Sequence, residues 1–342
     1  MCLHPTHIIA DHIKQPNATS QLHISNHTGK GRKQNMKPRF SQLIIVILFL
    51  VALFPGSALA HETEQTDDGD FFTIVWVSDT QDMAYRNRRD VLEKMGQWII
   101  RNRDALRIRY VVQTGDAVDN GASPWQWEAY DFLLRPFQGK IPYIAAAGNH
   151  EVKKNGFLEF SMRDDVRKIP RSHTIDRGKA AFATFSIHDR KFIIVSVGYG
   201  VELEYAGWMN QVLRMHKDHT AILILHDYLA VTGNFSHTGK EVFKQVVVPN
   251  PNVRLVLCGH VTSLKARADE IDDDGDGTPD RVVNQLLYDY QHFKDDCGQI
   301  RWLRFDLNNR SITVTTYSPH TERYYKDFNF GNQAIFTITD AF

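Results

Sequence analysis

The sequence predicts an α/β fold in which helices cover β-sheets, and three observations support that prediction. Short, unbroken apolar runs recur along the chain, as in strands that are buried on both faces. Amphipathic stretches, with apolar residues three and four positions apart, lie between several of these runs. The 342 residues are 42% apolar and 23% charged, which excludes a disordered or collagen-like chain as the bulk of the protein.

The apolar runs give the predicted strands, and the stretches between them give the predicted helices. Strands are expected at 72–77, 110–113, 143–147, 192–197, 221–225 and 253–258. A long helix is expected over 88–104, and shorter helices over 125–137, 207–216 and 240–247. This alternation favours layers of helix on sheet. Further strands at 285–290, 300–306 and 311–317 have no helix between them, so we expect a second, antiparallel sheet portion there.

The charge distribution argues against a polyanionic partner. Lys and Arg together number 40, as do Asp and Glu, so the formal net charge is zero. Residues 1–60 hold six of the bases and one of the acids, which leaves 34 bases and 39 acids after residue 60. A mildly acidic surface does not attract nucleic acid, so no specific nucleic-acid binding is indicated.

A signal peptide is predicted at residues 36–60. Met36 opens a short basic segment, twelve apolar residues cover 43–54, and Ala58-Leu59-Ala60 supplies the small residues of a cleavage site. Twelve apolar residues are fewer than the ~20 that cross a bilayer; an uncut membrane anchor is the alternative. Cleavage would leave a secreted or periplasmic protein that begins at residue 61 and has no transmembrane span.

The segments on either side of the signal peptide differ in character. Residues 1–35 are polar and His-rich without periodicity. We interpret them as an over-extended start or a disordered leader, with a metal-binding histidine tail as the alternative.

Residues 61–342 contain no repeat and no Pro- or Ser-rich linker, which favours a single domain. That domain keeps Cys258 and Cys297, and an exported protein could join them in one disulfide; two free thiols are the alternative.

Five of the predicted strands end at residues that bind metal ions in other proteins. The residues that follow these strands are Asp79 and Gln81, Asp116 and Asp119, Asn149 with His150 and Glu151, His226 with Asp227, and His260. Each pattern alone is typical of a turn or of a buried structural histidine. Ligands in an open α/β sheet gather outside the carboxyl ends of the strands. We therefore expect the whole set to meet in one crevice.

This ordered set resembles the calcineurin-like metallophosphoesterase family, whose motifs are D-x-H, G-D-x-x-D, G-N-H-[DE], a lone His and G-H-x-H. The resemblance covers about residues 72–320 and implies an αββα sandwich of two mixed β-sheets flanked by helices, with two divalent metal ions. It implies that Asp116 bridges both ions and that Asp79 and Gln81 belong to one site. The other site is completed by Asn149, His226 and His260. By the same resemblance, His150 binds no metal and acts on the leaving group. Asp119, Glu151 and Asp227 would support the metal ligands without binding the ions themselves.

The residue chemistry agrees with this resemblance. Carboxylate, amide oxygen and imidazole suit Mn, Fe or Zn, and Mg is a candidate for a site rich in oxygen. A pair of such ions can promote displacement at phosphorus, and a histidine that is not a ligand can act as a general acid near neutral pH. The sequence has no Gly-rich phosphate loop with a Lys and no G-x-S-x-G elbow, which excludes P-loop NTPases and serine hydrolases of that type.

The sequence departs from the family motifs at two positions. Gln81 stands in place of the His in D-x-H, and Thr262 in place of the second His in G-H-x-H. Both imidazoles would serve the same ion, so we expect one tight ion and one weak, exchangeable ion. The predicted function is an exported phosphoesterase that hydrolyses phosphate mono- or diesters, with a phosphorylated small molecule or polymer as substrate. A degenerate, non-catalytic protein that binds a phosphorylated ligand or a cation is the alternative.

A second metal motif lies further along the chain. Four acids fall at positions 1, 3, 5 and 9 of a calcium loop, namely Asp272, Asp274, Asp276 and Asp280. Position 12 is Val283, so the bidentate Glu of an EF-hand is missing. We interpret this segment as a calcium loop, with a solvated acidic turn as the alternative.

Aromatic residues are candidates for the wall of a substrate pocket. They are Trp125, Trp127, Tyr290 and His292, for which core packing is the alternative.

Overall fold

The computed structural model describes residues 70–153, 157–167, 172–291, 298–325 and 333–342. All of these residues belong to one compact unit, Ser57–Phe342. Within these ranges no helix has both the length and the apolar character needed to cross a bilayer. The predicted leader and signal peptide, Cys297 and His292 lie outside the described residues, so those predictions stay predictions.

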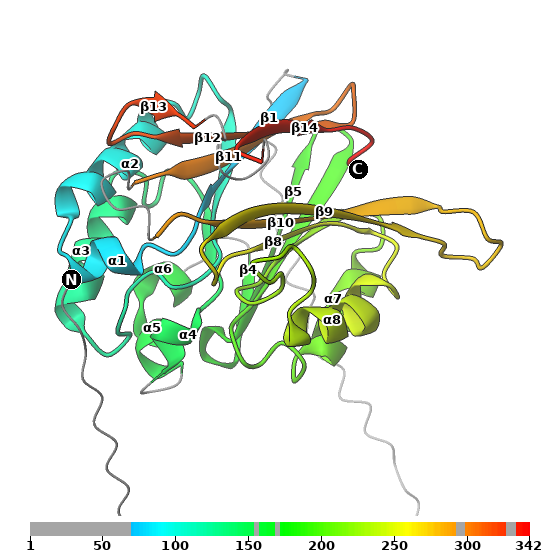
Figure 1. Ribbon diagram of the computed structural model, residues 1–342, viewed down its shortest axis with the longest axis horizontal. Coiled ribbons are helices and arrows are strands. Elements are labelled where there is room, and N and C mark those ends of the chain that lie inside the picture. The colour runs from blue at the N-terminus through cyan, green and yellow to red at the C-terminus, as the bar shows by residue number, and fades with distance from the viewer. Residues whose placement is uncertain (1–69, 154–156, 168–171, 292–297, 326–332) are drawn as a thin grey trace, which may run out of the picture. The chain divides into compact units, whose positions relative to one another are not determined.

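Two mixed β-sheets face each other, and helices lie on both outer faces (Figure 1). Sheet A has the order β13-β12-β11-β1-β2-β3, with β14 paired to β12. Its strands are β1 (Phe71–Val77), β2 (Ile108–Gln113), β3 (Tyr143–Ala145), β11 (Ile300–Asp306), β12 (Ser311–Ser318), β13 (Arg323–Tyr324) and β14 (Ile335–Ile338). Strands β1, β2 and β3 run parallel to one another.

Sheet B has the order β4-β5-β6-β7-β8-β10-β9. Its strands are β4 (Ser172–Ile175), β5 (Ala180–Ile187), β6 (Arg190–Val197), β7 (Thr220–Ile224), β8 (Val253–Cys258), β9 (Ser263–Ile271) and β10 (Arg281–Asp289). Strands β6, β7, β8 and β10 are parallel. The predicted αββα sandwich of two mixed sheets is therefore confirmed.

The helices form two groups. Sheet A is covered by α1 (Gln81–Tyr85), α2 (Arg89–Arg101), α3 (Pro124–Leu134), α5 (Leu158–Met162) and α6 (Asp164–Arg167). Sheet B is covered by α7 (Ala206–Met215) and α8 (His237–Val242), the latter continued by a π-helical turn, η2 (Phe243–Val247). The short α4 (Asn149–Val152) and the 3₁₀ turn η1 (Asp176–Gly178) lie between strands.

Alternate side chains of a strand enter different cores. In β1, Ile74 and Trp76 pack between the two sheets, whereas Val75 and Val77 pack against the helices that cover sheet A. Both faces of such a strand are buried, which explains why the sequence shows unbroken apolar runs in place of alternation. The long helix α2 follows the expected period, with Val91, Leu92, Met95 and Ile99 buried against sheet A.

The C-terminal strands differ from the prediction. β10 lies in sheet B parallel to β8, with Leu287 opposite Cys258, while β11 and β12 extend sheet A antiparallel beside β1. The expected antiparallel portion is confirmed for β11 and β12, although they extend sheet A, and the expectation was wrong for β10, which is parallel to β8. The physical reason is that β1 would otherwise present an unpaired edge, which β11 covers; pairing partners depend on free edges and not on order in the sequence.

The carboxyl ends of parallel strands from both sheets meet in one place. The Asp79 backbone N–H, after β1, donates to Gly115 O at 3.2 Å, after β2. The Gly259 N–H, after β8, donates to His226 O at 3.1 Å, after β7. The first bond joins two loops of sheet A and the second joins two loops of sheet B, while a contact of 2.8 Å between His226 Nδ1 and Thr114 O connects the two sheets. These are the loops that carry the motif residues.

Candidate metal centre

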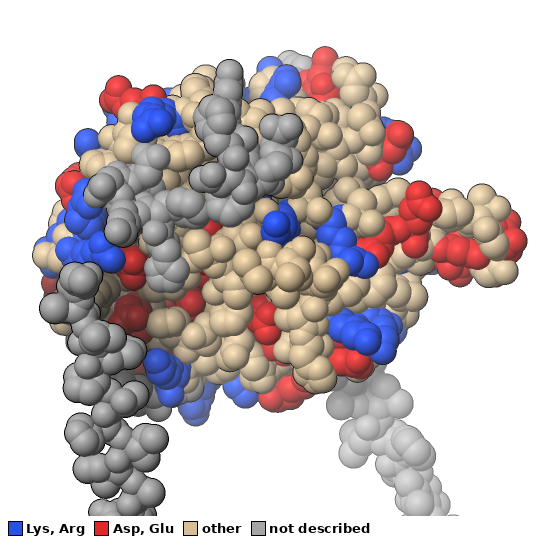
Figure 2. Space-filling model, viewed as in Figure 1, with Lys and Arg blue, Asp and Glu red and all other residues tan. Residues whose placement is uncertain are grey.

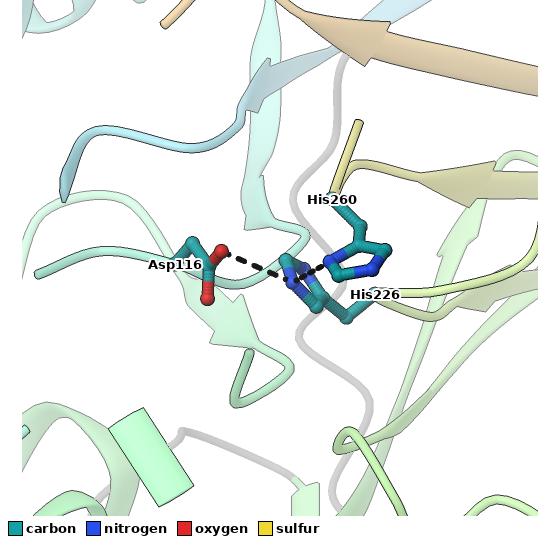
Figure 3. A group of neighbouring side chains, drawn as sticks. All are labelled: Asp116, His226 and His260. Atoms are coloured by element: carbon teal, nitrogen blue, oxygen red, sulfur yellow. Dashed lines mark hydrogen bonds and ion pairs between the residues drawn. The ribbon is translucent and has the colours of Figure 1, made fainter. Parts of the chain in front are cut away.

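Four donor atoms that the sequence predicts as ligands converge on one point, and Figure 3 shows three of the residues that supply them, Asp116, His226 and His260. His226 Nε2 lies 3.3 Å from Asp116 Oδ2 and 3.2 Å from His260 Nδ1. Asn149 Oδ1 lies 2.9 Å from the same His226 nitrogen and 3.0 Å from the same His260 nitrogen. Ligands at about 2.1 Å from an ion are about 3.0 Å apart in octahedral and about 3.4 Å apart in tetrahedral coordination. Both the donor set and its spacing fit one divalent ion.

The orientation of His226 is fixed by the opposite side of its ring. His226 is fully buried, and its Nδ1 lies 2.8 Å from Thr114 O. A carbonyl oxygen only accepts, so Nδ1 carries the proton and Nε2 faces the other ligands, the arrangement found at metal-binding histidines. Burial alone would lower the pKa of His226, but Asp116 outweighs it and raises the pKa to about 10. The surroundings therefore favour positive charge at this point.

Glu151 joins the loops that hold Asp116 and Asn149. Its buried carboxylate accepts from the backbone N–H groups of Asp116 (2.9 Å), Val118 (3.0 Å) and Gly148 (2.6 Å). Burial, and then the charge of Asp116, raise the pKa of Glu151 to about 7. The side chain thus supports the ligands through the backbone. Asp227, the other predicted supporting acid on a strand end, is half-buried beside His226.

His150 lies beside the ligand cluster but is not part of it. Its Nδ1 is 2.9 Å from Asp119 O and 3.1 Å from Asp119 Oδ1. Its Nε2 is 3.9 Å from Asp116 Oδ2, and the side chain is 24% exposed. Two acceptors on Nδ1 fix the proton there, so Nε2 is the nitrogen presented towards the centre.

The residues predicted for the second ion are arranged differently. Asp79 is buried beside the first group but outside it: its Oδ1 accepts from His260 N at 3.0 Å and its Oδ2 from the Ser78 hydroxyl. In the orientation that satisfies its hydrogen bonds, the Gln81 amide nitrogen donates to the carbonyl oxygens of Asp116 (2.9 Å) and Asp79 (3.1 Å). The Thr262 hydroxyl donates to Asp289 Oδ2 at 3.2 Å.

Burial, and then the charges of Asp289 and Asp116, hold the pKa of Asp79 well above its usual range. Burial by itself would also raise the pKa of Asp116, but the charge of His226 and hydrogen bonding lower it overall. The pKa of His260 is lowered by burial and by the charge of His226. The site therefore holds acidic and basic side chains close together in a region that is largely buried from solvent.

Two residues at the site were not predicted from the sequence. Asp289 is fully buried at the end of β10. Tyr199 follows β6, and its ring centroid lies 5.8 Å from that of His226 and 5.6 Å from that of His260. Tyr199 follows the predicted strand 192–197, so the criterion that identified the other motif residues could have found it, whereas Asp289 lies inside the predicted strand 285–290 and would not have been found in this way.

The aromatic candidates are placed mainly as packing residues. Trp127 is buried, and its Nε1 donates to Gly121 O at 2.7 Å. Tyr290 is buried in the core between the sheets. Trp125 is 44% exposed beside Tyr85.

The backbone at the site is unusual. Asp79, Asp116 and His260 have φ angles of 47°, 51° and 79°, in the left-handed region that non-glycine residues seldom occupy, although Asp and His do so more readily than most. The motif glycines allow close approach: a Cβ atom on Gly148 would overlap the Asp116 carboxylate, and one on Gly259 would overlap that of Asp79. The glycines of the motifs are therefore needed for space as well as for turning.

The predicted calcium loop forms the tip of the long β9–β10 hairpin (Figure 1). One carboxylate oxygen from each of Asp272, Asp274 and Asp276 lies within 4.8 Å of the others, and all three residues are exposed. Figure 2 shows acidic side chains gathered at this projecting end. Asp280 instead accepts from Asp273 N at 2.7 Å. The structure thus brings three of the four predicted residues into one group.

Comparison with known proteins identifies a family and several relatives. The family described as calcineurin-like phosphoesterase matches residues 72–263. The uncharacterized protein YvnB of Bacillus subtilis (strain 168) is 39% identical over 281 residues, which cover 79% of this chain and 22% of that protein. A probable cyclic nucleotide phosphodiesterase of Moraxella catarrhalis (strain BBH18) is 29% identical over 160 residues, 43% of this chain and 56% of that protein. The chain thus spans less than two thirds of either relative.

A solved structure shares the fold. The crystal structure of a dimetal phosphatase from Danio rerio superposes with a TM-score of 0.53 at 13% identity, covering 78% of this chain and 98% of that one. The family match at 72–263 contains all the motif residues from Asp79 to Thr262, while Asp289 and the acidic hairpin tip lie beyond it.

Proposed function

The chain belongs to the calcineurin-like phosphoesterase family, and on that basis we propose that it is a metal-dependent hydrolase of phosphate esters. The observation that carries the proposal is the convergence of Asp116, Asn149, His226 and His260 at ligand spacing. Divalent ions held there would supply the Lewis acidity that displacement at phosphorus requires. Mn, Fe and Zn suit a site with two imidazoles.

In this proposal His150 is the general acid that protonates the leaving oxygen. The assignment is supported by its place beside the ligands, 3.9 Å from Asp116 Oδ2, and by its 24% exposure. Asp119 contacts Nδ1 of the ring through its carboxylate and its carbonyl oxygen and fixes the orientation of the imidazole. Nε2 then delivers its proton towards the substrate, and Asp119 is a positioning residue.

The substrate is proposed only as a class. Phosphodiesters and phosphomonoesters both fit a two-ion centre, and the Moraxella relative, named as a probable cyclic nucleotide phosphodiesterase, favours testing diesters first. The partly exposed ring of Tyr199 over His226 and His260 offers an apolar wall for the group esterified to phosphate. We further propose export from the cytoplasm, supported by the segment at 36–60.

The test is turnover of p-nitrophenyl phosphate and bis(p-nitrophenyl) phosphate with Mg²⁺, Mn²⁺, Zn²⁺ or Fe²⁺ added to chelator-treated protein. His150→Ala should lower kcat by about 10²–10⁴ and leave bound metal unchanged, whereas His237→Ala, an exposed histidine, should change neither. Absence of turnover with every ion would overturn the enzyme assignment. Loss of metal in His150→Ala would overturn the role of His150.

A further inference from the structure

We propose that Tyr199 and Asp227 form a subsite for an alkylammonium group, carried by one ester group of a phosphodiester substrate. The inference rests on the proposed function, because it names a substrate class for the same centre. It gives Asp227 a direct contact with substrate, whereas the sequence predicted only a supporting role for this residue. Glu202 adds negative charge behind the two contact residues.

Two neighbouring strands of sheet B place the subsite beside the metal ligands. β6 and β7 are parallel; Tyr199 follows β6, and Asp227 follows β7 directly after the ligand His226. The Tyr199 ring centroid lies 5.8 Å from that of His226 and 5.6 Å from that of His260. Tyr199 and Asp227 are both partly exposed, so a molecule bound at the centre can reach them.

The Asp227 carboxylate lies on the same side of the centre as the Tyr199 ring. Burial raises the pKa of Tyr199, and the charge of Asp227 is the largest electrostatic contribution to that shift, followed by the charge of Glu202. The charge of Asp227 also acts on His260, where it opposes the lowering of the pKa by burial and by His226. An aromatic ring and a carboxylate therefore border the same edge of the ligand group.

Neither acid has a positively charged partner among the residues that the structure describes. The Asp227 carboxylate forms no hydrogen bond or ion pair with them, and the buried Oε1 of Glu202 has no hydrogen-bond partner there. The nearby Lys179 pairs instead with Asp176 at 3.2 Å and with Glu204 at 3.7 Å. The negative charge at this edge is therefore available to a cation that comes with the substrate.

Glu202 is a positioning residue for the loop that carries Tyr199. Its carboxylate accepts from the backbone N–H groups of Gly200 and of Glu202 itself, and only 2% of the residue is exposed. Burial raises the pKa of Glu202 to about 7, these bonds oppose the shift, and the charge of Asp227 adds to it. A cation bound nearby favours the ionised form of such an acid, so Glu202 would strengthen the subsite when it is occupied.

The chemistry of the subsite favours an organic cation. Ammonium groups are attracted to the face of an aromatic ring and to carboxylates. A bare metal ion fits less well, because neither acid belongs to a group of three donors at metal spacing among the described residues. His150 lies beside Asp116 and Asp119, whereas Tyr199 lies over the two imidazole ligands. We therefore assign the ammonium to the ester group that stays on phosphorus when His150 protonates the leaving oxygen.

The experiment compares kcat/KM of the Mn²⁺-loaded full chain for three p-nitrophenyl diesters that differ only in the second alcohol. These are p-nitrophenyl phosphocholine, p-nitrophenyl phosphoethanolamine and the uncharged p-nitrophenyl neohexyl phosphate, in which carbon replaces the choline nitrogen. Wild type should favour at least one ammonium ester over the neutral ester by about 10-fold, and the favoured ester shows whether the subsite takes a quaternary or a primary ammonium. Tyr199→Leu should reduce this preference about 5-fold, Asp227→Asn should reduce it by a similar factor, and Tyr199→Phe, which keeps the ring, should retain it.

Asp218→Asn is the matched control, because the exposed Asp218 precedes β7 whereas Asp227 follows it; it should keep the preference. Equal kcat/KM for all three esters in wild type, or a preference unchanged in both Tyr199→Leu and Asp227→Asn, would overturn the assignment. Loss of bound metal in Asp227→Asn would also overturn it, because Asp227 would then support the ligand His226.

Calorimetric binding of phosphocholine and of neohexyl phosphate tests the subsite without turnover. An inactive wild type that binds phosphocholine more tightly, and loses this preference in Asp227→Asn, supports the subsite and refutes the enzyme. An active wild type that binds and hydrolyses charged and neutral esters equally well supports the enzyme and refutes the subsite.

Discussion

Glu202 provides a test of the electrostatics around the centre. It lies in the loop between β6 and α7, is 2% exposed, and its Oε1 has no hydrogen-bond partner among the described residues. Burial raises its pKa from 4.5 to about 7, although backbone N–H groups act in the opposite direction. The folded protein therefore binds more protons than the unfolded chain between these two pH values, and the free energy of unfolding falls as the pH rises through that window.

The size of the effect follows from the two pKa values. Each pKa unit corresponds to about 1.4 kcal/mol, so an ionised Glu202 lowers stability by about 3 kcal/mol above pH 8. Part of this loss is already present at pH 5, which leaves about 2.5 kcal/mol between pH 5 and pH 8. Glu202→Gln should be free of this loss.

The assay is urea unfolding of wild type and Glu202→Gln at pH 5 and pH 8, in chelator so that metal binding adds no proton release of its own. The difference between the two proteins should grow by about 2.5 kcal/mol in favour of the variant from pH 5 to pH 8. Glu204→Gln is the control, since the Glu204 side chain is 60% exposed two residues away. An equal difference at both pH values would refute the reasoning.

Further predictions concern catalysis, metal binding and export. Asp119→Asn should lower kcat by about 10²-fold with bound metal unchanged, because it removes the charge that holds His150 Nδ1; a fall in bound metal would show a ligand role instead. Mild chelation should remove one ion before the other and lower turnover in proportion, and loss of both ions together would contradict two unlike sites. The double variant Asp274→Ala with Asp276→Ala should lower the midpoint of thermal unfolding only when calcium is present; equal midpoints in millimolar calcium would leave a solvated acidic turn. N-terminal sequencing of the exported protein should find His61 first, and an intact Met1 or Met36 would contradict cleavage.

The sequence was sufficient for the layers of the fold because both faces of the central strands are buried. Because both faces of β1, β6 and β8 are buried, successive residues in these strands are mostly apolar. The strands at and beside the edges of sheet B show a weaker pattern. The edge strand β9 alternates mostly between half-buried and exposed residues, and β5, which lies next to the edge strand β4, mixes small residues with aromatic ones. Strand order depends on which edges are free, and for that reason the place of β11 beside β1 could not be read from the sequence.

The first metal group could be predicted because each ligand follows its own strand within a few residues. Asp116, Asn149 and His260 each come after a glycine, which marks the turn at a strand end. Asp289 has no such mark: it is the last residue of a strand, and its neighbours in the sequence are aromatic. Its place at the site comes from the parallel register with β8, which is a property of the assembled sheet.

The left-handed backbone at Asp79, Asp116 and His260 has a consequence for laboratory evolution. A non-glycine residue in this region loses about 1–2 kcal/mol relative to a relaxed conformation, and glycine does not. A selection for heat resistance alone would therefore tend to enrich glycine at these three positions, and the winners would have lost their ligands. Libraries screened for thermal stability should therefore keep these three codons unchanged, or should be sorted for bound Mn²⁺ in the same round. At these positions a gain in thermal stability would come with a loss of metal binding.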